Sequence, residues 1–173
     1  MKSATVILIS LGCLAFGLTP GQTKAQDTGT KTPVAHKQVI SANPFLLLWE
    51  WGNIEYERKV SPKMTVGAAA SVLSVDDVNY ESLNGLLRYY PQGAAMSGFS
   101  FGGRLGVHNG SDDKEEGHTF GFGVDIGYSW LLGADRNFYI GMGFGLTRFF
   151  GGDLEEDRVV LPSIRLINVG FAF

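Results

Sequence analysis

Six charged residues of this chain share one property that could place them in a functional site. In an extended chain, each points to the opposite side from the apolar residue next to it. The six are Glu55, Glu57, Lys59, Arg88, Arg104 and Asp125. Acidic and basic groups in a confined space can neutralise one another in a structural ion-pair network. They can also line a narrow path for ions or protons. The elements that carry them decide between these two roles.

A second group of polar side chains, between His108 and His118, contains residue types that bind metals or catalyse hydrolysis. Apart from the two histidines, the group consists of Ser111, Asp112, Asp113, Glu115 and Glu116. A base, a nucleophile and an orienting carboxylate could be drawn from His108, Ser111 and either Asp112 or Glu115. The two histidines have opposite parity in an extended chain, and the spacing of a zinc or EF-hand site is missing. We therefore expect neither a specific metal site nor another cofactor.

The chain between residues 119 and 147 alternates large apolar residues with glycine. A side-chain period of two indicates β-strands, because successive Cβ atoms point to opposite faces. A column of glycines rarely faces water in a soluble sheet. In a small membrane barrel, by contrast, lipid contacts the large apolar face and the crowded interior holds small and polar residues. The apolar series is Phe120, Phe122, Val124, Ile126, Tyr128, Trp130, Phe138, Ile140, Met142, Phe144 and Leu146.

Eight extended segments can be drawn along the chain, and an even number returns the C-terminus to the side where the first strand begins. They cover residues 38–49, 52–60, 63–75, 80–91, 97–108, 118–132, 137–150 and 160–173. Pro44 cannot donate to a strand ladder, so it predicts a bulge or a first strand that begins near Phe45. The fold class expected is all-β: an eight-stranded antiparallel up-and-down transmembrane β-barrel.

The connections between these segments alternate in kind. Compact turns are expected at 61–63, 91–95 and 133–136, and wetter, acidic links at 76–77, 109–117 and 151–158. Short turns on one side and longer loops on the other are typical of bacterial outer-membrane barrels. The first connection breaks the pattern, because residues 51–54 predict a tight two-residue hairpin.

The N-terminal residues have the pattern of a secretory signal peptide. Lys2 supplies a positive charge, residues 4–18 are mostly apolar, and Ala25 is the small residue after which a signal peptidase would cut. We therefore expect residues 1–25 to be removed. Cys13 would be removed with them, which leaves a mature chain without cysteine.

The remaining chain divides into a short leader and one domain. Residues 26–37 are polar and are expected to form a flexible leader, and residues 38–173 the barrel domain. The net charge of −3 comes without a basic patch, so nucleic acid is not an expected partner. After Leu18 no apolar stretch reaches the length of a spanning helix.

Aromatic residues are expected at two levels, as in the interfacial girdles of a membrane barrel. One level holds Tyr89, Phe99, Trp130, Phe138, Phe171 and Phe173. The other level holds Trp49, Trp51, Tyr80, Phe120 and Phe149.

Three short segments resemble small outer-membrane β-barrel domain proteins of the OmpX/OmpW-like kind. They are Ser41-Ala42-Asn43-Pro44, Ile54-Glu55-Tyr56-Glu57 and Arg88-Tyr89-Tyr90-Pro91. The resemblance implies a barrel in the bacterial outer membrane, in contact with outer-membrane lipid and lipopolysaccharide. It also implies a C-terminal signal that the barrel-assembly machinery reads. Residues that match this signal are Ile167, Val169, Phe171 and Phe173.

An eight-stranded barrel leaves little bore, so we expect the six charged residues to plug its interior as ion pairs. The expected role is structural, or surface interaction through acidic outer loops, without catalysis. The alternatives are a lipid A-modifying enzyme, such as a deacylase or palmitoyl transferase, a narrow pore, and a soluble secreted barrel that binds an apolar ligand. The glycine series argues against the soluble barrel, since that protein would need its large apolar residues inside.

Overall fold

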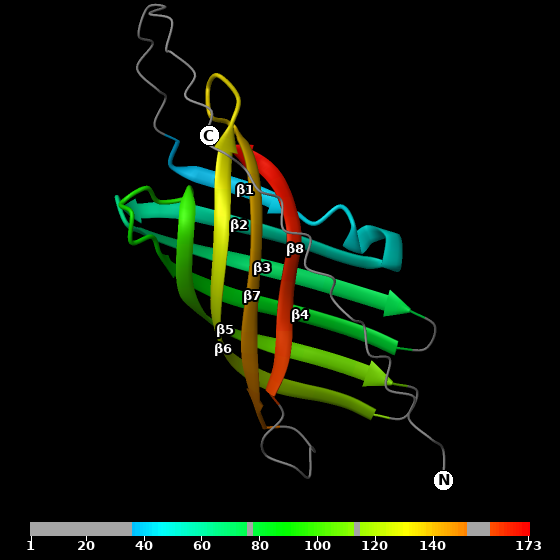
Figure 1. Cartoon of the computed structure of the whole chain (residues 1–173). Helices are drawn as coiled ribbons and strands as arrows, with labels where there is room; N and C mark the ends of the chain where they lie inside the picture. Colours follow the sequence, from blue (N-terminus) through cyan, green and yellow to red (C-terminus); the bar gives the residue numbers. More distant parts are fainter. Residues whose placement is uncertain (1–35, 76–77, 113–114, 152–159) are drawn as a thin grey trace, which may run out of the picture. The chain divides into compact units, whose positions relative to one another are not determined.

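A closed barrel of antiparallel strands, each paired with its neighbours in sequence, forms the body of the protein (Figure 1). The computed structural model describes residues 36–75, 78–112, 115–151 and 160–173. The strands are β1 (Gln38–Ala42), β2 (Trp51–Ser61), β3 (Met64–Val75), β4 (Val78–Tyr89), β5 (Gly98–Asp112), β6 (Glu115–Leu132), β7 (Phe138–Phe150) and β8 (Val160–Ala172). The predicted eight-stranded antiparallel up-and-down barrel is confirmed.

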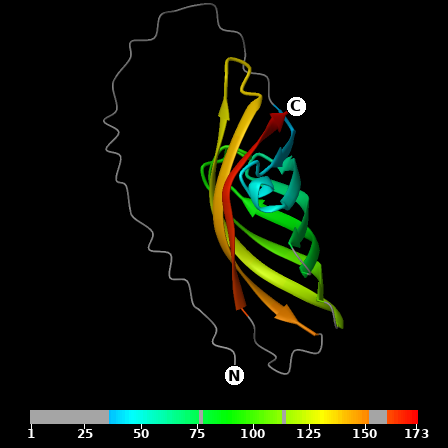
Figure 2. The same ribbon diagram turned by 90° about the vertical axis from the view of Figure 1, so that its right-hand side faces the viewer.

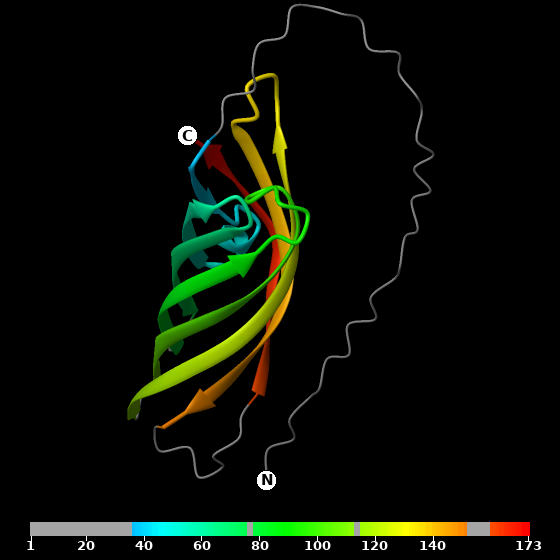
Figure 3. The same ribbon diagram turned by 90° about the vertical axis from the view of Figure 1, so that its left-hand side faces the viewer.

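The barrel closes where the last strand pairs with the first. Val39 to Ala42 of β1 lie opposite Ala172 to Val169 of β8. Figures 2 and 3 show β8 (red) beside β1 (blue) at the C-terminal end of the chain. The same end carries the connections 62–63, 90–97 and 133–137, and we call it the terminal end. The opposite end, where β5 and β6 are joined, is called the hairpin end.

The two faces of the wall have opposite character. Large apolar side chains point outward on every long strand, for example Val124, Ile126 and Phe144, which are about half exposed. Buried polar and charged residues point inward, among them Glu57, Arg88 and Asn168. This arrangement reverses that of a soluble barrel, in which apolar residues fill the interior. Within the described residues, no helix is both long enough and apolar enough to cross a membrane.

The first strand is much shorter than predicted. It ends at Ala42, and a 3-10 helix, η1 (Leu46–Trp49), precedes β2. The Asn43 side chain sets this end: its Oδ1 accepts hydrogen bonds from the backbone N–H groups of Phe45 and Leu46, at 3.0 and 3.2 Å. Such an Asx turn diverts the backbone away from the ladder. The predicted bulge or strand start near Phe45 is therefore wrong.

The predicted hairpin at 51–54 is also wrong, because Trp51 already belongs to β2 and Ala42 lies opposite Ile54. The first connection therefore runs from residue 43 to residue 50. Next to the predicted boundary between leader and barrel, the Lys37 N–H donates to the carbonyl of Phe173 at 3.0 Å. Residues 1–25 and the leader up to residue 35 lie outside the described residues.

The predicted loop 109–117 is largely strand. β5 continues to Asp112 and β6 begins at Glu115, and these two residues lie opposite each other. The expectation of a loop failed because it assumed that strands end where apolar alternation ends. The predicted links at 76–77 and 152–158 lie outside the described residues.

Candidate functional site: the barrel interior

An apolar layer fills the interior at the terminal end. Val39, Met96, Tyr139 and Ala172 are buried against one another, and Leu131 packs on them. Met96 belongs to the 90–97 connection, which therefore contributes a side chain to the interior of the barrel. We call these residues the apolar cap.

An ionic layer centred on Arg88 adjoins the apolar cap. The guanidinium of Arg88 binds Glu55 in a bidentate manner, with Nη1–Oε1 and Nη2–Oε2 distances of 2.7 and 3.1 Å. Arg88 Nη1 also donates to Glu57, whose second oxygen accepts from the Tyr90 hydroxyl at 2.7 Å. Asp125 lies 3.6 Å from Arg88 Nη2. Bidentate, charge-assisted contacts of this kind fix both partners in one geometry.

Two further arginines complete the ionic layer. Arg165 Nη1 donates to Glu55 Oε1 at 2.8 Å, and Arg104 Nη2 donates to Asp125 Oδ2 at 3.2 Å. The guanidiniums of Arg88, Arg104 and Arg165 thus face the carboxylates of Glu55, Glu57 and Asp125. The charges balance, as buried ion pairs require. The ionic layer and the apolar cap together are called the plug.

The structure brings together five of the six charged residues that the sequence singled out. The sixth, Lys59, is half-buried on β2 and makes no ion pair within the described part of the chain. Its backbone N–H donates to the carbonyl of Lys37, which places it near the terminal end of the barrel. Its position along β2 therefore keeps Lys59 out of the ionic layer, although its side-chain parity is the same as that of the other five residues.

Sequence reasoning missed Arg165, and a β-bulge explains the omission. Gly141 lies opposite Asn168, whereas Gly143 lies opposite Arg165, so β8 contains one extra residue at this point. A bulge shifts the side-chain parity of the strand that contains it. Counting back in steps of two from Phe173 therefore put Arg165 on the outer face, although its side chain is buried. Tyr90 and Tyr139 were missed as well: both have inward parity, but the prediction was made for charged residues alone.

The interior glycines make room for these side chains. A Cβ added at Gly127 would lie 2.8 Å from Arg165 Nη2, and one at Gly123 would lie 2.8 Å from Arg104 Cγ. At Gly121 it would lie 2.6 Å from His108 Nε2. Any larger residue would displace a charged or aromatic group from the interior. The glycine residues of the inward series thus leave the space that these interior side chains occupy.

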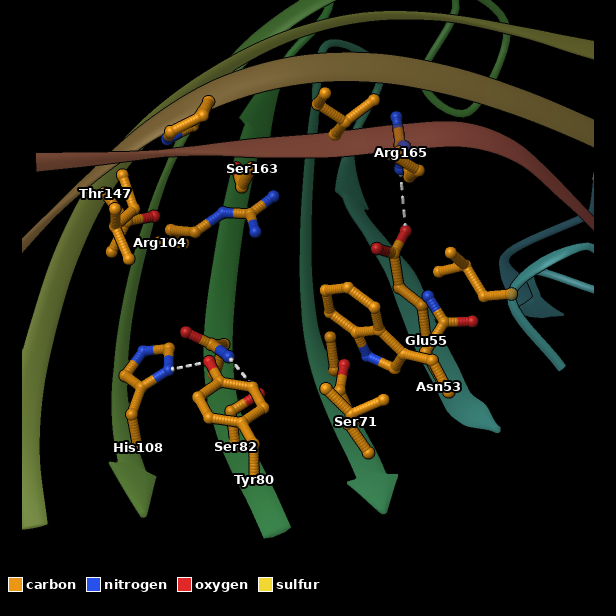
Figure 4. A pocket seen from close by; sticks show the side chains of 18 of the residues that line it. Asn53, Glu55, Ser71, Tyr80, Ser82, Arg104, His108, Thr147, Ser163 and Arg165 are labelled. Carbon is orange, nitrogen blue, oxygen red and sulfur yellow. Dashed lines mark hydrogen bonds and ion pairs between the residues drawn. The ribbon is translucent and has the colours of Figure 1, made fainter. Parts of the chain in front are cut away.

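A cavity of about 420 Å³ lies on the other side of the ionic layer, toward the hairpin end (Figure 4). Its polar lining comes from Asn53, Ser71, Ser82, Asn84, Arg104, His108, Thr147 and Ser163, among others. The apolar lining includes Leu46, Trp51, Leu73, Phe149, Leu161, Pro162 and Ile164. We call this cavity the cup; Glu55 and Arg165 of the ionic layer also line it.

His108 is held in the cup by two contacts. Its Nδ1 is hydrogen-bonded to the Tyr80 hydroxyl at 2.5 Å, and its ring meets that of Phe149 edge-on, with centroids 4.8 Å apart. His118, by contrast, is exposed. The two histidines diverge, as their parity predicts. The side chains of Ser111, Asp112, Asp113, Glu115 and Glu116 lie outside the described set, and the remaining residues contain no cluster of three metal-binding side chains.

The aromatic levels expected from the sequence require a correction. Trp51, Tyr80 and Phe149 line the cup and so belong to the interior. Phe120 and Phe150 are the aromatic residues that point outward near the hairpin end of β6 and β7. Parity places Phe149 inside, since it follows Thr147 by two residues.

No protein-family model and no curated protein matches the sequence. Among solved structures, the chain is similar to the backbone structure of the Yersinia pestis outer membrane protein Ail in a phospholipid bilayer nanodisc. The two chains share 13% sequence identity, and the match covers 80% of this chain and 100% of that chain with a TM-score of 0.47. The eight-stranded barrel is itself the architecture that the resemblance to small outer-membrane barrels implies.

Proposed function

We propose that this protein is an integral barrel of the bacterial outer membrane with a structural or surface-interaction role. One observation carries the proposal: a closed barrel whose outward side chains are apolar encloses charged residues that are paired and buried. Backbone groups in hydrocarbon must be satisfied within the protein, and a closed barrel meets that condition over most of its wall. The same outer face would be unstable in water.

The orientation follows from the connections. At the terminal end the connections 62–63 and 133–137 are short, whereas at the hairpin end β5 and β6 continue as a paired hairpin beyond the apolar series; this asymmetry favours the periplasmic side for the terminal end, and the hairpin end then faces outward. Export would use the signal peptide 1–25, with cleavage near Ala25. The assembly machinery would read Ile167, Val169, Phe171 and Phe173, of which Phe171 and Phe173 are about half exposed. Acidic residues of the outer connections would meet lipopolysaccharide phosphates through bridging cations.

The plug supports a role without an open channel. Arg88, Tyr139 and Met96 are each at most 2% exposed, so the ionic layer and the apolar cap are packed without a continuous water path at these side chains. Opening a path would require buried charges to separate, which is costly. We expect no steady ion conductance from the purified protein in planar bilayers. Steady conductance would favour the narrow-pore alternative instead.

Cell fractionation tests the proposal. The protein should appear in the outer-membrane fraction, resist extraction without detergent, and migrate faster on gels before heating than after it. Recovery in a soluble fraction without detergent would contradict the proposal and favour the soluble-barrel alternative. A change in the acyl pattern of lipid A that depends on His108, tested with His108→Ala and mass spectrometry, would favour the enzyme alternative.

A further inference from the structure

The wall of the barrel is incomplete along one edge of β8. β8 pairs with β7 from Val160 to Phe171, but with β1 only from Val169 to Ala172. The cause is the early end of β1 at Ala42 (Figure 1). Among the described residues, no backbone hydrogen bond joins residues 160–168 of β8 to the 43–50 connection or to β2. The barrel therefore has a slot between β8 and the connection that contains η1.

The cup opens into this slot. Leu161 lies opposite the inward Thr147, whereas Pro162 and Ile164 have the opposite parity, yet all three residues of β8 line the cup. β8 contributes five successive residues, 161–165, to this lining, whereas the other strands contribute alternate residues, which places the unpaired edge of β8 on the border of the cup. Leu46 of η1 lines the cup from the other side of the slot.

The residues that border the slot are apolar and exposed. Ile164 and Leu166 are 57% and 51% exposed on β8, and Leu48 of η1 is 77% exposed. These residues continue the outward apolar surface of β6 and β7, so in the proposed orientation the slot opens toward the hydrocarbon of the bilayer. A free strand edge at the depth of the hydrocarbon is tolerated only where it is buried in protein or lines a water-filled cavity. The cup, with its polar lining, provides such a cavity beside the free edge of β8.

The inner part of the cup holds a cation with unused hydrogen-bonding capacity. Arg104 carries five N–H donors, and within the described residues its guanidinium makes one hydrogen bond, to Asp125. Figure 4 shows this side chain projecting into the cavity. The 7%-exposed side chains of Asn84 and His108 and the 9%-exposed Arg165 also line the cup, and Asn84 Oδ1, His108 Nε2 and Arg165 Nε have no partner.

We propose that the slot and the cup form a laterally entered binding site for a single-chain amphiphile with a carboxylate head, such as a long-chain fatty acid dissolved in the bilayer. The carboxylate binds the free face of the Arg104 guanidinium. The acyl chain runs over Leu161, Pro162 and Ile164 and leaves through the slot beside Leu46. A volume of about 420 Å³ is within the range of ligand pockets, roughly 300–1,000 Å³. The plug closes the inner side, so the site retains its ligand and does not conduct it.

The inference rests on the proposed membrane location, since the slot is to be filled from lipid. Its chemistry follows from the lining: an apolar portal that ends at an arginine selects a molecule with one apolar chain and one anionic head. Charge-assisted hydrogen bonds between a guanidinium and a carboxylate are about twice as strong as neutral ones. An uncharged analogue of the same length should therefore bind more weakly.

Quenching of Trp51 fluorescence tests the site, because Trp51 lines the cup. The full mature chain with Trp49→Phe and Trp130→Phe, which leaves Trp51 as its tryptophan, is purified in dodecyl maltoside. It is titrated with 9,10-dibromostearic acid and with the methyl ester of that acid. We expect saturable quenching by the acid and at least tenfold weaker binding of the ester. Equal, unsaturated quenching by both probes would overturn the proposal, since it would report partition into micelles alone.

Two variants locate the two halves of the ligand. Arg104→Gln should weaken binding of the acid about tenfold or more and leave binding of the ester unchanged, whereas Arg148→Gln, on the outer face of β7, should change neither. Leu161→Glu should abolish quenching by the acid, and Leu161→Met should preserve it. Unchanged binding in Arg104→Gln or Leu161→Glu would overturn the proposed placement. If either variant fails to show heat-modifiable mobility, the acid–ester comparison on the parent chain decides the proposal.

The outcome is separable from that of the proposed function. The titration is done in micelles, so binding can fail while fractionation still places the protein in the outer membrane. Recovery in a soluble fraction would instead remove the lipid source and contradict both proposals.

Discussion

Replacing Arg88 by methionine should destabilise the barrel more than any surface change. The side chain is 2% exposed and neutralises two carboxylates at once, through two hydrogen bonds to Glu55 and one to Glu57. In Arg88→Met, Glu55 keeps its contact with Arg165, whereas Glu57 keeps only the hydrogen bond from Tyr90. One buried carboxylate thus loses its only cation among the described residues.

The expected cost is about 3–5 kcal/mol of unfolding free energy, the usual result of leaving a buried charge without its partner. Domains of this size are stable by roughly 5–15 kcal/mol, so the variant should fold but be markedly less stable. Removing the second charge as well should restore part of the loss. Arg88→Met combined with Glu57→Gln should therefore be about 1–3 kcal/mol more stable than Arg88→Met alone.

Urea titration of the barrel refolded into lipid vesicles measures these differences, followed by tryptophan fluorescence and by heat-modifiable mobility. The urea concentration at the midpoint of unfolding should fall, while the slope of the unfolding free energy against urea concentration stays constant. Arg136→Met, in the exposed 133–137 turn, is the matched control and should change stability little. A cost for Arg88→Met below about 1 kcal/mol would refute the account, since that is the size expected of a solvated surface pair.

Three further predictions concern the seam, the first connection and the sealed interior. Gly170→Ala should cost about 1–3 kcal/mol in the same titration, because the new Cβ would lie 2.6 Å from Ser41 Cβ across the β1–β8 seam. Gly110→Ala, where no atom lies within 4 Å, should be neutral or stabilise the barrel by about 0.5 kcal/mol; equal effects of the two changes would count against the described seam. Asn43→Ala removes the acceptor of two backbone N–H groups and should cost about 0.5–2 kcal/mol, together with faster hydrogen exchange at Phe45 and Leu46; unchanged exchange would contradict the Asx turn. Arg88→Met should increase the rate of ion leakage through vesicles that hold the protein, and leakage equal to that of Arg136→Met would argue that the ionic layer does not seal the interior.

The sequence predicted the barrel because lipid and a narrow interior impose opposite demands on alternate residues. Val124 and Ile126 point outward and Asp125 inward, as the alternation indicates. Glu55, Glu57, Arg88 and Arg104 likewise have inward parity, and all four lie in the ionic layer. The alternation of side chains was sufficient to predict which residues face inward wherever a strand is regular and its outward residues are apolar.

The failures occur where local geometry interrupts the alternation. Asn43 ends β1 through its own side chain, and alternation cannot foresee such a turn. The bulge near Met142 reverses the parity of β8 and hid Arg165. Polar hairpin residues up to Asp112 and from Glu115 continue the ladder beyond the apolar band, because backbone pairing does not need apolar side chains. The slot depends on the unequal lengths of β1 and β8, which is a property of the closed barrel and not of either segment.

The central claim is that lipid contacts the outward side chains, and an arginine scan along β6 in lipid vesicles tests it most directly. Ile126 lies midway along the outward series that runs from Phe120 to Leu132. We predict that Ile126→Arg lowers the unfolding free energy by about 2–4 kcal/mol, and that Phe120→Arg and Leu132→Arg, near the interfaces, lower it by about 0–1 kcal/mol. A flat profile, with the three arginines equally tolerated, would contradict the claim, because it is the profile of a face in contact with water.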